Sequence, residues 1–121
     1  MSPLTITIQD ARTGPVLEVA GDLDYDTAAD LRRAVESLAL TAGRLLVLDL
    51  GGLDFCDSSG LTALIVARNH ALAAQADIAL AAVPANTARV LGIVGLDQVF
   101  AIHPDAAGAT AAASGPRAAS G

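Results

Sequence analysis

Residues 45–75, LLVLDLGGLDFCDSSGLTALIVARNHALAAQ, contain the strongest structural pattern in the chain. The run Leu45–Leu50 is almost continuously apolar, which is typical of a strand buried on both faces of a sheet. Residues 51–57 predict a loop, and Ser58 to about Gln75 predicts a long helix. One face of that helix is apolar, through Leu61, Leu64, Ile65 and Leu72. A buried strand that leads directly into a helix indicates an α/β fold.

The segments on either side complete this pattern. Residues 4–8 alternate apolar and polar side chains, and a turn at 12–15 predicts a hairpin with a strand at 16–20. The other predicted elements are a helix at 28–42 ended by Gly43, a strand at 78–83, a helix from Pro84 to Gly95 and a strand at 98–102. We therefore expect a mixed β-sheet of about five strands with helices packed on it.

The chain has 121 residues, a length that predicts a single domain. We place this domain at residues 1–104. Residues 105–121 are rich in Ala, Gly and Ser and lack large apolar side chains. Because such a segment buries little surface, we expect a frayed or disordered C-terminal tail.

The composition argues against several classes of function. A net charge of −6 and an aromatic content of 2% disfavour direct binding of nucleic acids, which attract basic surfaces and stack on aromatic rings. No apolar stretch reaches the ~18 residues that span a bilayer, and the first residues lack a signal-peptide pattern, so we expect a cytoplasmic protein without membrane contact. A lone Cys56 and two distant histidines predict neither a disulfide nor a metal site, and no cofactor motif is present.

No arrangement of side chains in the sequence predicts catalysis. Ser58 and His70 would lie on one helix, about 18 Å apart along its axis, whereas a nucleophile and its base lie within about 3 Å of each other. His103 follows the last predicted strand, and nothing in the sequence brings it near Ser58. We therefore expect that the protein is not an enzyme.

Two hydroxyl groups lie where the buried strand leads into the helix, in Asp57-Ser58-Ser59-Gly60. Asp57 or Ser58 can cap the helix, which is the purely structural interpretation. Alternatively, one serine is exposed and accepts a phosphate, which the free N–H groups and the dipole of a helix N-terminus tolerate. The spacing alone hardly separates Ser58 from Ser59.

Aspartates are concentrated in two segments that follow strands. They are Asp22, Asp24 and Asp26 in the first segment and Asp54 and Asp57 in the second. In an α/β sheet both segments can lie at the same edge. The aspartates are then either solvated loop acids, with Asp26 or Thr27 capping the next helix, or an acidic patch for a basic partner.

Two residues near this region have alternative interpretations. Arg68 falls on the apolar face of the predicted helix, either because its aliphatic stem snorkels to the sheet edge or because it contacts an acid or a partner. Cys56 is either a small buried hydrophobe or a redox-active thiol.

The segment Asp57–Leu61, preceded by Leu53–Cys56, resembles the phosphorylation motif of bacterial anti-sigma factor antagonists in the STAS (sulfate transporter and anti-sigma antagonist) domain family. Gly21–Asp24 is similar to the G-x-L-D loop of this family, Thr27-Ala28 to the start of its first helix, and Leu91–Leu96 to the segment before its last strand. The resemblance extends from about Leu4 to Ile102 and implies a STAS-like single domain.

This resemblance implies a function in partner switching. Such proteins bind an anti-sigma factor that is also an ATP-dependent serine/threonine kinase, and they thereby free a sigma factor for transcription. The kinase phosphorylates the serine after the aspartate, here Ser58, and the complex dissociates; a phosphatase acting on phospho-Ser58 restores binding. Asp24 and Asp57 would contact the partner, and Ser59 and Gly60 would line the phosphoacceptor site.

Two other functions are alternatives. A STAS regulatory module of a transport or lipid-trafficking complex would bind a transporter ATPase without being phosphorylated. A nucleotide or small-ligand sensor ranks lower, because the sequence shows no phosphate-cradling loop and no basic site.

Overall fold

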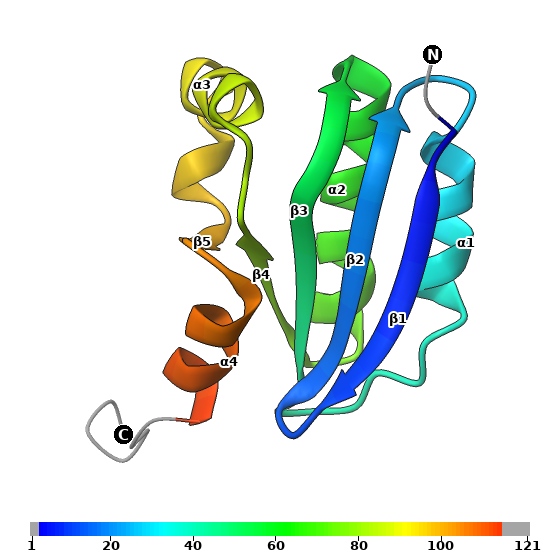
Figure 1. Cartoon of the computed structure of the whole chain (residues 1–121). Helices are drawn as coiled ribbons and strands as arrows, with labels where there is room; N and C mark the ends of the chain where they lie inside the picture. Colours follow the sequence, from blue (N-terminus) through cyan, green and yellow to red (C-terminus); the bar gives the residue numbers. More distant parts are fainter. Residues whose placement is uncertain (1–2, 115–121) are drawn as a thin grey trace.

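The computed structural model describes residues 3–114, which form a five-stranded sheet with helices packed on it (Figure 1). The strands are β1 (Thr5–Ala11), β2 (Gly14–Leu23), β3 (Leu45–Cys56), β4 (Asp77–Ala81) and β5 (Ala101–His103). The helices are α1 (Ala28–Glu36), α2 (Ser58–Ala73), α3 (Ala85–Val94), the short 3₁₀ helix η1 (Leu96–Gln98) and α4 (Ala106–Ser114).

The strands follow one another across the sheet in the order β1-β2-β3-β4-β5. β1 and β2 form an antiparallel hairpin, and the pairs from β2 to β5 are parallel. The hairpin turn requires Gly14, because its φ is +152° and a Cβ there would lie 1.9 Å from the carbonyl oxygen of Leu45. The predicted mixed α/β architecture is therefore confirmed.

The main hydrophobic core lies between one face of the sheet and the helices α1 and α2, which run side by side (Figure 1). Leu17, Leu48 and Leu80 point into this core from β2, β3 and β4 and are completely buried. On the buried side of α2, small side chains let the helix approach closely. These are Ala63, Ala67 and Ala71, each at most 1% exposed.

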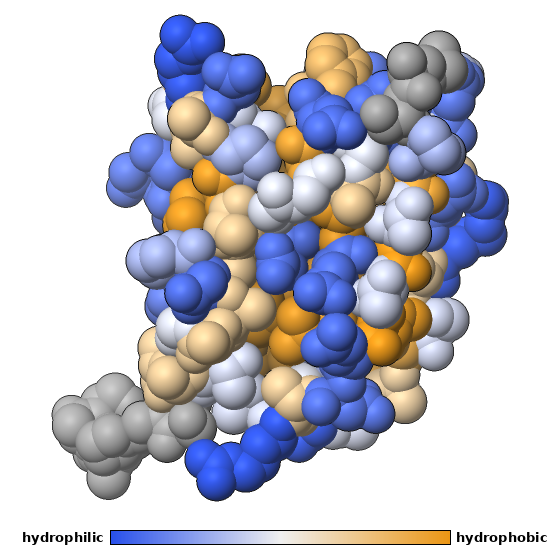
Figure 2. Space-filling model, in the orientation of Figure 1, coloured by the Kyte–Doolittle hydropathy of each residue, from blue (hydrophilic) through white to orange (hydrophobic). Residues whose placement is uncertain are grey.

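A smaller core lies on the opposite face of the sheet, where α4 packs. The composition of residues 105–121 predicts a frayed or disordered tail, but residues 106–114 form this helix; residues 115–121 lie outside the described residues. Ala109 is 1% exposed and packs with Val16, Val47 and Ala79. The small side chains of Ala109 and Ala79 let the helix come close to the strands, so the helix needs no large apolar residue of its own. Away from α4, hydrophilic and apolar residues are mixed on this side of the molecule (Figure 2).

Two boundaries differ from the sequence predictions in ways that affect the site. β3 continues to Cys56 rather than ending at Leu50, because its last residues still pair with β2. α1 ends at Glu36 rather than near Gly43. There the Ser37 hydroxyl donates a hydrogen bond to the Ala34 carbonyl at 2.7 Å, a local interaction that competes with continuation of the helix.

The contact of α4 with the sheet gives a prediction about stability. Ala109→Leu adds a large side chain where the helix meets Val47 and Ala79, and overpacking of this kind lowers the free energy of unfolding by about 1–3 kcal/mol. Ala107→Leu, at an exposed position of the same helix, is the matched control and is expected to be near neutral. Urea denaturation of both variants tests this. Equal stabilities would mean that α4 does not pack on the sheet in solution.

Candidate functional site

The two aspartate-containing segments lie side by side at the carboxyl ends of β2 and β3, as expected from the sequence. β2 and β3 are parallel neighbours, and their last residues, Leu23 and Cys56, are paired. The backbone N–H of Asp57 donates a hydrogen bond to the Leu23 carbonyl at 3.2 Å, which ties the second segment to the end of β2. The loop after β2 (residues 24–27, called the acidic loop below) and the start of α2 therefore form one continuous surface.

Asp24 holds the acidic loop in its conformation. One of its carboxylate oxygens, Oδ1, accepts hydrogen bonds from the backbone N–H groups of Asp26 at 3.0 Å and Thr27 at 3.2 Å. The Thr27 hydroxyl donates to the Asp22 carbonyl at 2.7 Å. The sequence predicts Asp26 or Thr27 as the helix cap. Thr27 is the N-cap residue of α1, but its side chain makes no capping hydrogen bond. The carboxylate that stabilises this helix start is that of Asp24.

Asp57 is the N-cap residue of α2, and its Oδ1 accepts a hydrogen bond from the Gly60 N–H at 3.0 Å. Of the two capping candidates, the structure thus selects Asp57. Ser58 is the first residue of the helix and is exposed, whereas Ser59 is only partly exposed. Ser59 lines a groove of about 210 Å³ between α1 and α2, together with Tyr25, Arg32 and Thr62.

Gly60 lies under the surface rather than on it. A Cβ at this position would lie 2.7 Å from both the Leu23 carbonyl oxygen and the Cys56 Sγ atom. Glycine is therefore required for the first turn of α2 to pass over the ends of β2 and β3. Its buried position gives Gly60 a packing role beneath the site.

The thiol of Cys56 lies beneath the same helix turn. Burial, and secondarily the negative charge of Asp57, raises the pKa of Cys56 from 9.0 to about 11. Its Sγ donates a weak hydrogen bond to the Asp57 carbonyl at 3.7 Å. A protonated, partly buried thiol favours the interpretation of Cys56 as a small packing residue over a redox-active one.

Two exposed aromatic side chains lie in the aspartate-containing segments, and no pattern in the sequence had marked either of them as functional. Tyr25, in the acidic loop, is 82% exposed, and Phe55, near the end of β3, is 52% exposed, whereas Phe100 is buried. Phe55 also borders a groove of about 300 Å³ whose other wall includes Thr87 and Val90 of α3. The available signal was their position, since both aromatics lie next to aspartates in segments that were expected to be polar loops.

The histidines lie away from Ser58. Ser58 is at the first residue of α2 and His70 is in its last turn, and His103 ends β5. Within residues 3–114, no cluster of three or more His, Cys, Asp or Glu side chains is arranged to bind a metal ion. None of the helices in this part of the chain is long and apolar enough to cross a membrane.

Comparison with known proteins identifies the family. A family model described as "Mlab, STAS domain" matches residues 6–103, so the chain belongs to the STAS domain family. A STAS-domain containing protein of Pseudomonas aeruginosa is 34% identical over 86 residues, which cover 71% of this chain and 84% of that protein. The anti-sigma-F factor antagonist RsfB of Mycobacterium tuberculosis is 29% identical over 97 residues, which cover 80% of this chain and 79% of RsfB. The crystal structure of an anti-sigma factor antagonist from Mycobacterium paratuberculosis has a TM-score of 0.81 and 28% identity, and the match covers 92% of this chain and 94% of that one.

The close packing at Gly60 gives a second prediction. Gly60→Ala forces the new methyl group against the backbone of Leu23, and we expect the free energy of unfolding to fall by about 1–3 kcal/mol. Gly92→Ala is the matched control: it also lies within a helix, but its Cβ would come no closer than 3.6 Å to another atom. That variant is expected to be neutral or slightly stabilising. Thermal denaturation of the two variants checks the prediction, and equal effects would contradict it.

The raised pKa of Cys56 gives a third prediction. A pKa of about 11 instead of 9.0 leaves roughly a hundredfold less thiolate at pH 8 in the folded protein. Alkylation by iodoacetamide at pH 8 should therefore be about a hundredfold slower in buffer than in urea. Because Cys56 is the only cysteine in the chain, the reaction reports on a single thiol. Similar rates in the two solvents would show that the thiol is neither buried nor perturbed.

Proposed function

We propose that this protein is an anti-sigma factor antagonist that is switched by phosphorylation of Ser58. Its unphosphorylated form binds an anti-sigma factor that is a serine/threonine kinase, and phosphorylation of Ser58 abolishes this binding. A phosphatase that acts on phospho-Ser58 restores it. The observation that carries the proposal is the exposed Ser58 hydroxyl at the start of α2, directly beside the acidic loop. RsfB and the similar mycobacterial structure, both named as antagonists, support the same assignment.

Exposure favours Ser58 over Ser59 as the phosphoacceptor. A kinase must reach the hydroxyl from solvent, and Ser59 is turned into the groove between α1 and α2. Within the described residues, the Ser58 hydroxyl makes no hydrogen bond. The backbone carbonyl of Ser58 accepts one from the Thr62 hydroxyl at 3.0 Å. Phosphorylation of Ser58 would therefore leave the observed hydrogen bonds intact.

Charge accounts for release of the partner without a change of fold. A phosphoryl group adds about −1.5 to −2 charge at pH 7. It would add negative charge and bulk beside Asp24 and Asp57, on a surface that is already acidic. A partner surface that fits the unmodified form would therefore fit the phosphorylated form less well. A loss of about 3 kcal/mol in binding free energy corresponds to a roughly hundredfold weaker complex.

The exposed aromatics supply the apolar part of this interface. Tyr and Phe side chains are enriched in the buried centres of protein–protein interfaces. Tyr25 and Phe55 lie in the two chain segments that carry the aspartates, and both are exposed. We therefore include both among the contact residues, with Asp24 and Asp57. Ser59 and Gly60 shape the site from below.

Affinity capture from native lysate, followed by mass spectrometry, tests the proposed function. The wild-type protein and Ser58→Ala should both capture an ATP-binding serine/threonine kinase, and Ser58→Glu should lose it. With the captured kinase and ATP, wild type and Ser59→Ala should accept one phosphate, and Ser58→Ala should accept none. Tyr25→Ala and Phe55→Ala should each weaken capture, whereas Arg89→Ala, at an exposed position of α3, should not.

Three results would overturn the proposal. One is capture of the same proteins by wild type and Ser58→Glu, and another is phosphate found on Ser59. The third is capture of a transporter subunit in place of a kinase, which would favour the alternative of a regulatory module in a transport or lipid-trafficking complex.

A further inference from the structure

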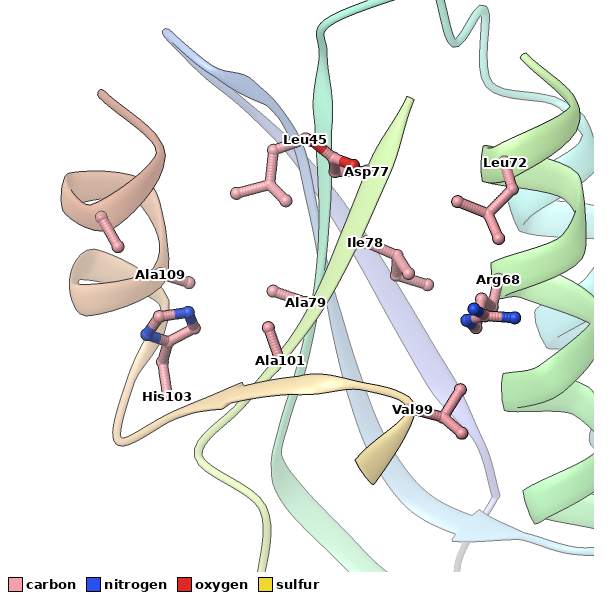
Figure 3. A pocket seen from close by; sticks show the side chains of 11 residues that line it. Leu45, Arg68, Leu72, Asp77, Ile78, Ala79, Val99, Ala101, His103 and Ala109 are labelled. Atoms are coloured by element: carbon pink, nitrogen blue, oxygen red, sulfur yellow. The ribbon is translucent and has the colours of Figure 1, made fainter. Parts of the chain in front are cut away.

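A second candidate site lies at the far edge of the sheet, where β4 is only partly covered. β5 pairs with Ala79–Ala81 of β4, and within residues 3–114 no strand pairs with the first two residues of β4 on that side. A pocket of about 410 Å³ opens at this gap (Figure 3). Its volume falls in the range of small-molecule sites, roughly 300–1,000 Å³. Arg68, in this pocket, is ten residues from Ser58 on α2, which is about 15 Å along the helix axis.

Arg68 is the unusual side chain of this pocket. It lies one helical turn after Leu64, which is completely buried, and one turn before Leu72, on the side of α2 that faces the sheet. Among the arginines in the described part of the chain, Arg68 alone is not exposed. Figure 3 shows its side chain beside Ile78, Leu72 and Val99.

No acidic side chain neutralises Arg68 within residues 3–114. The ion pair found there joins Arg33 to Asp30, and Arg68 makes no hydrogen bond to a neighbour. Asp77 also borders the pocket, but its carboxylate lies on the other side of β4, near Leu45 (Figure 3). A partly dehydrated guanidinium without a counter-charge favours binding of an anion, preferably a planar one such as a carboxylate.

The walls around Arg68 are aliphatic and partly exposed. Leu72 and Val99 are each 43% exposed, and Ile78 forms the deeper surface at 9%. Leu45 lines the pocket on the other side of β4, beside Asp77 (Figure 3). Covering large apolar side chains is favourable, so the best ligand has an aliphatic body as well as a charge. Val99 lies in the segment between η1 and β5, and its exposed side chain is not part of either core.

We propose that this pocket binds a small amphipathic carboxylate, with the carboxylate on Arg68 and a short aliphatic chain along Leu72, Ile78 and Val99. The proposal is independent of the partner-switching function, because no residue of the pocket belongs to the Ser58 surface. It also gives Arg68 a role that neither snorkelling nor an internal ion pair supplies.

NMR titration of the ¹⁵N-labelled full chain tests the proposal with three probes. Octanoate has both the charge and the chain, octanol has the chain without the charge, and acetate has the charge without the chain. We expect saturable shifts with octanoate, centred on the amides of Arg68, Ile78 and Val99. Octanol should bind about tenfold more weakly, as expected for loss of one charge-assisted hydrogen bond, and acetate should cause no saturable shift.

Variants locate the site. Arg68→Gln keeps the length of the side chain and removes its charge, and it should weaken octanoate binding about tenfold. Arg89→Gln, at an exposed arginine of α3, is the control and should bind as wild type does. Val99→Glu places a negative charge at the rim and should abolish binding, while a dispersed spectrum confirms that the variant is folded. Shifts spread over the surface, equal binding of octanol and octanoate, or unchanged binding by Arg68→Gln would each overturn the proposal.

Discussion

The parallel pairing of β2 and β3 at their carboxyl ends is the constraint on which the functional surface depends. The register shifts twice along this pair, and small residues make the close approach feasible. A Cβ on Gly52 would lie 2.7 Å from the Cβ of Ala20, and one on Gly60 would meet the backbone of Leu23. Gly60 therefore lies where β2, β3 and α2 come together, and this close approach places the acidic loop beside Ser58.

The aspartates of this surface stabilise the fold and also give the surface its negative charge. Asp24 and Asp57 each use one carboxylate oxygen to accept backbone N–H groups, at the start of α1 and of α2. Removing either side chain would alter the helix start as well as the negative charge, since caps of this kind contribute about 0.5–2 kcal/mol. Substitution by asparagine keeps an acceptor oxygen, so it separates the effect of charge from the effect of loop geometry.

Hydrophobic periodicity was sufficient to predict the order of elements, the mixed sheet and the meeting of the two loops. It failed where close packing of small residues replaces large apolar contacts. Gly51 and Gly52 indicated a loop, although they belong to a bulged strand. The alanines of residues 106–114 indicated a frayed tail, although Ala109 packs in the core between α4 and the sheet. Exposure of Tyr25 and Phe55 depends on the tertiary arrangement and leaves no periodic pattern in the sequence.

The proposed phosphoacceptor and the Arg68 pocket both lie on α2. The packing of this helix determines whether the two sites can be coupled. Coupling between two sites requires an element with two arrangements that both ligands bias. α2 rests on the sheet through Gly60 and a row of buried alanines, and sliding it along its axis would bring larger neighbours onto Leu23. Close packing of this kind favours a single position for α2. A ligand at Arg68 is therefore not expected to move the Ser58 surface.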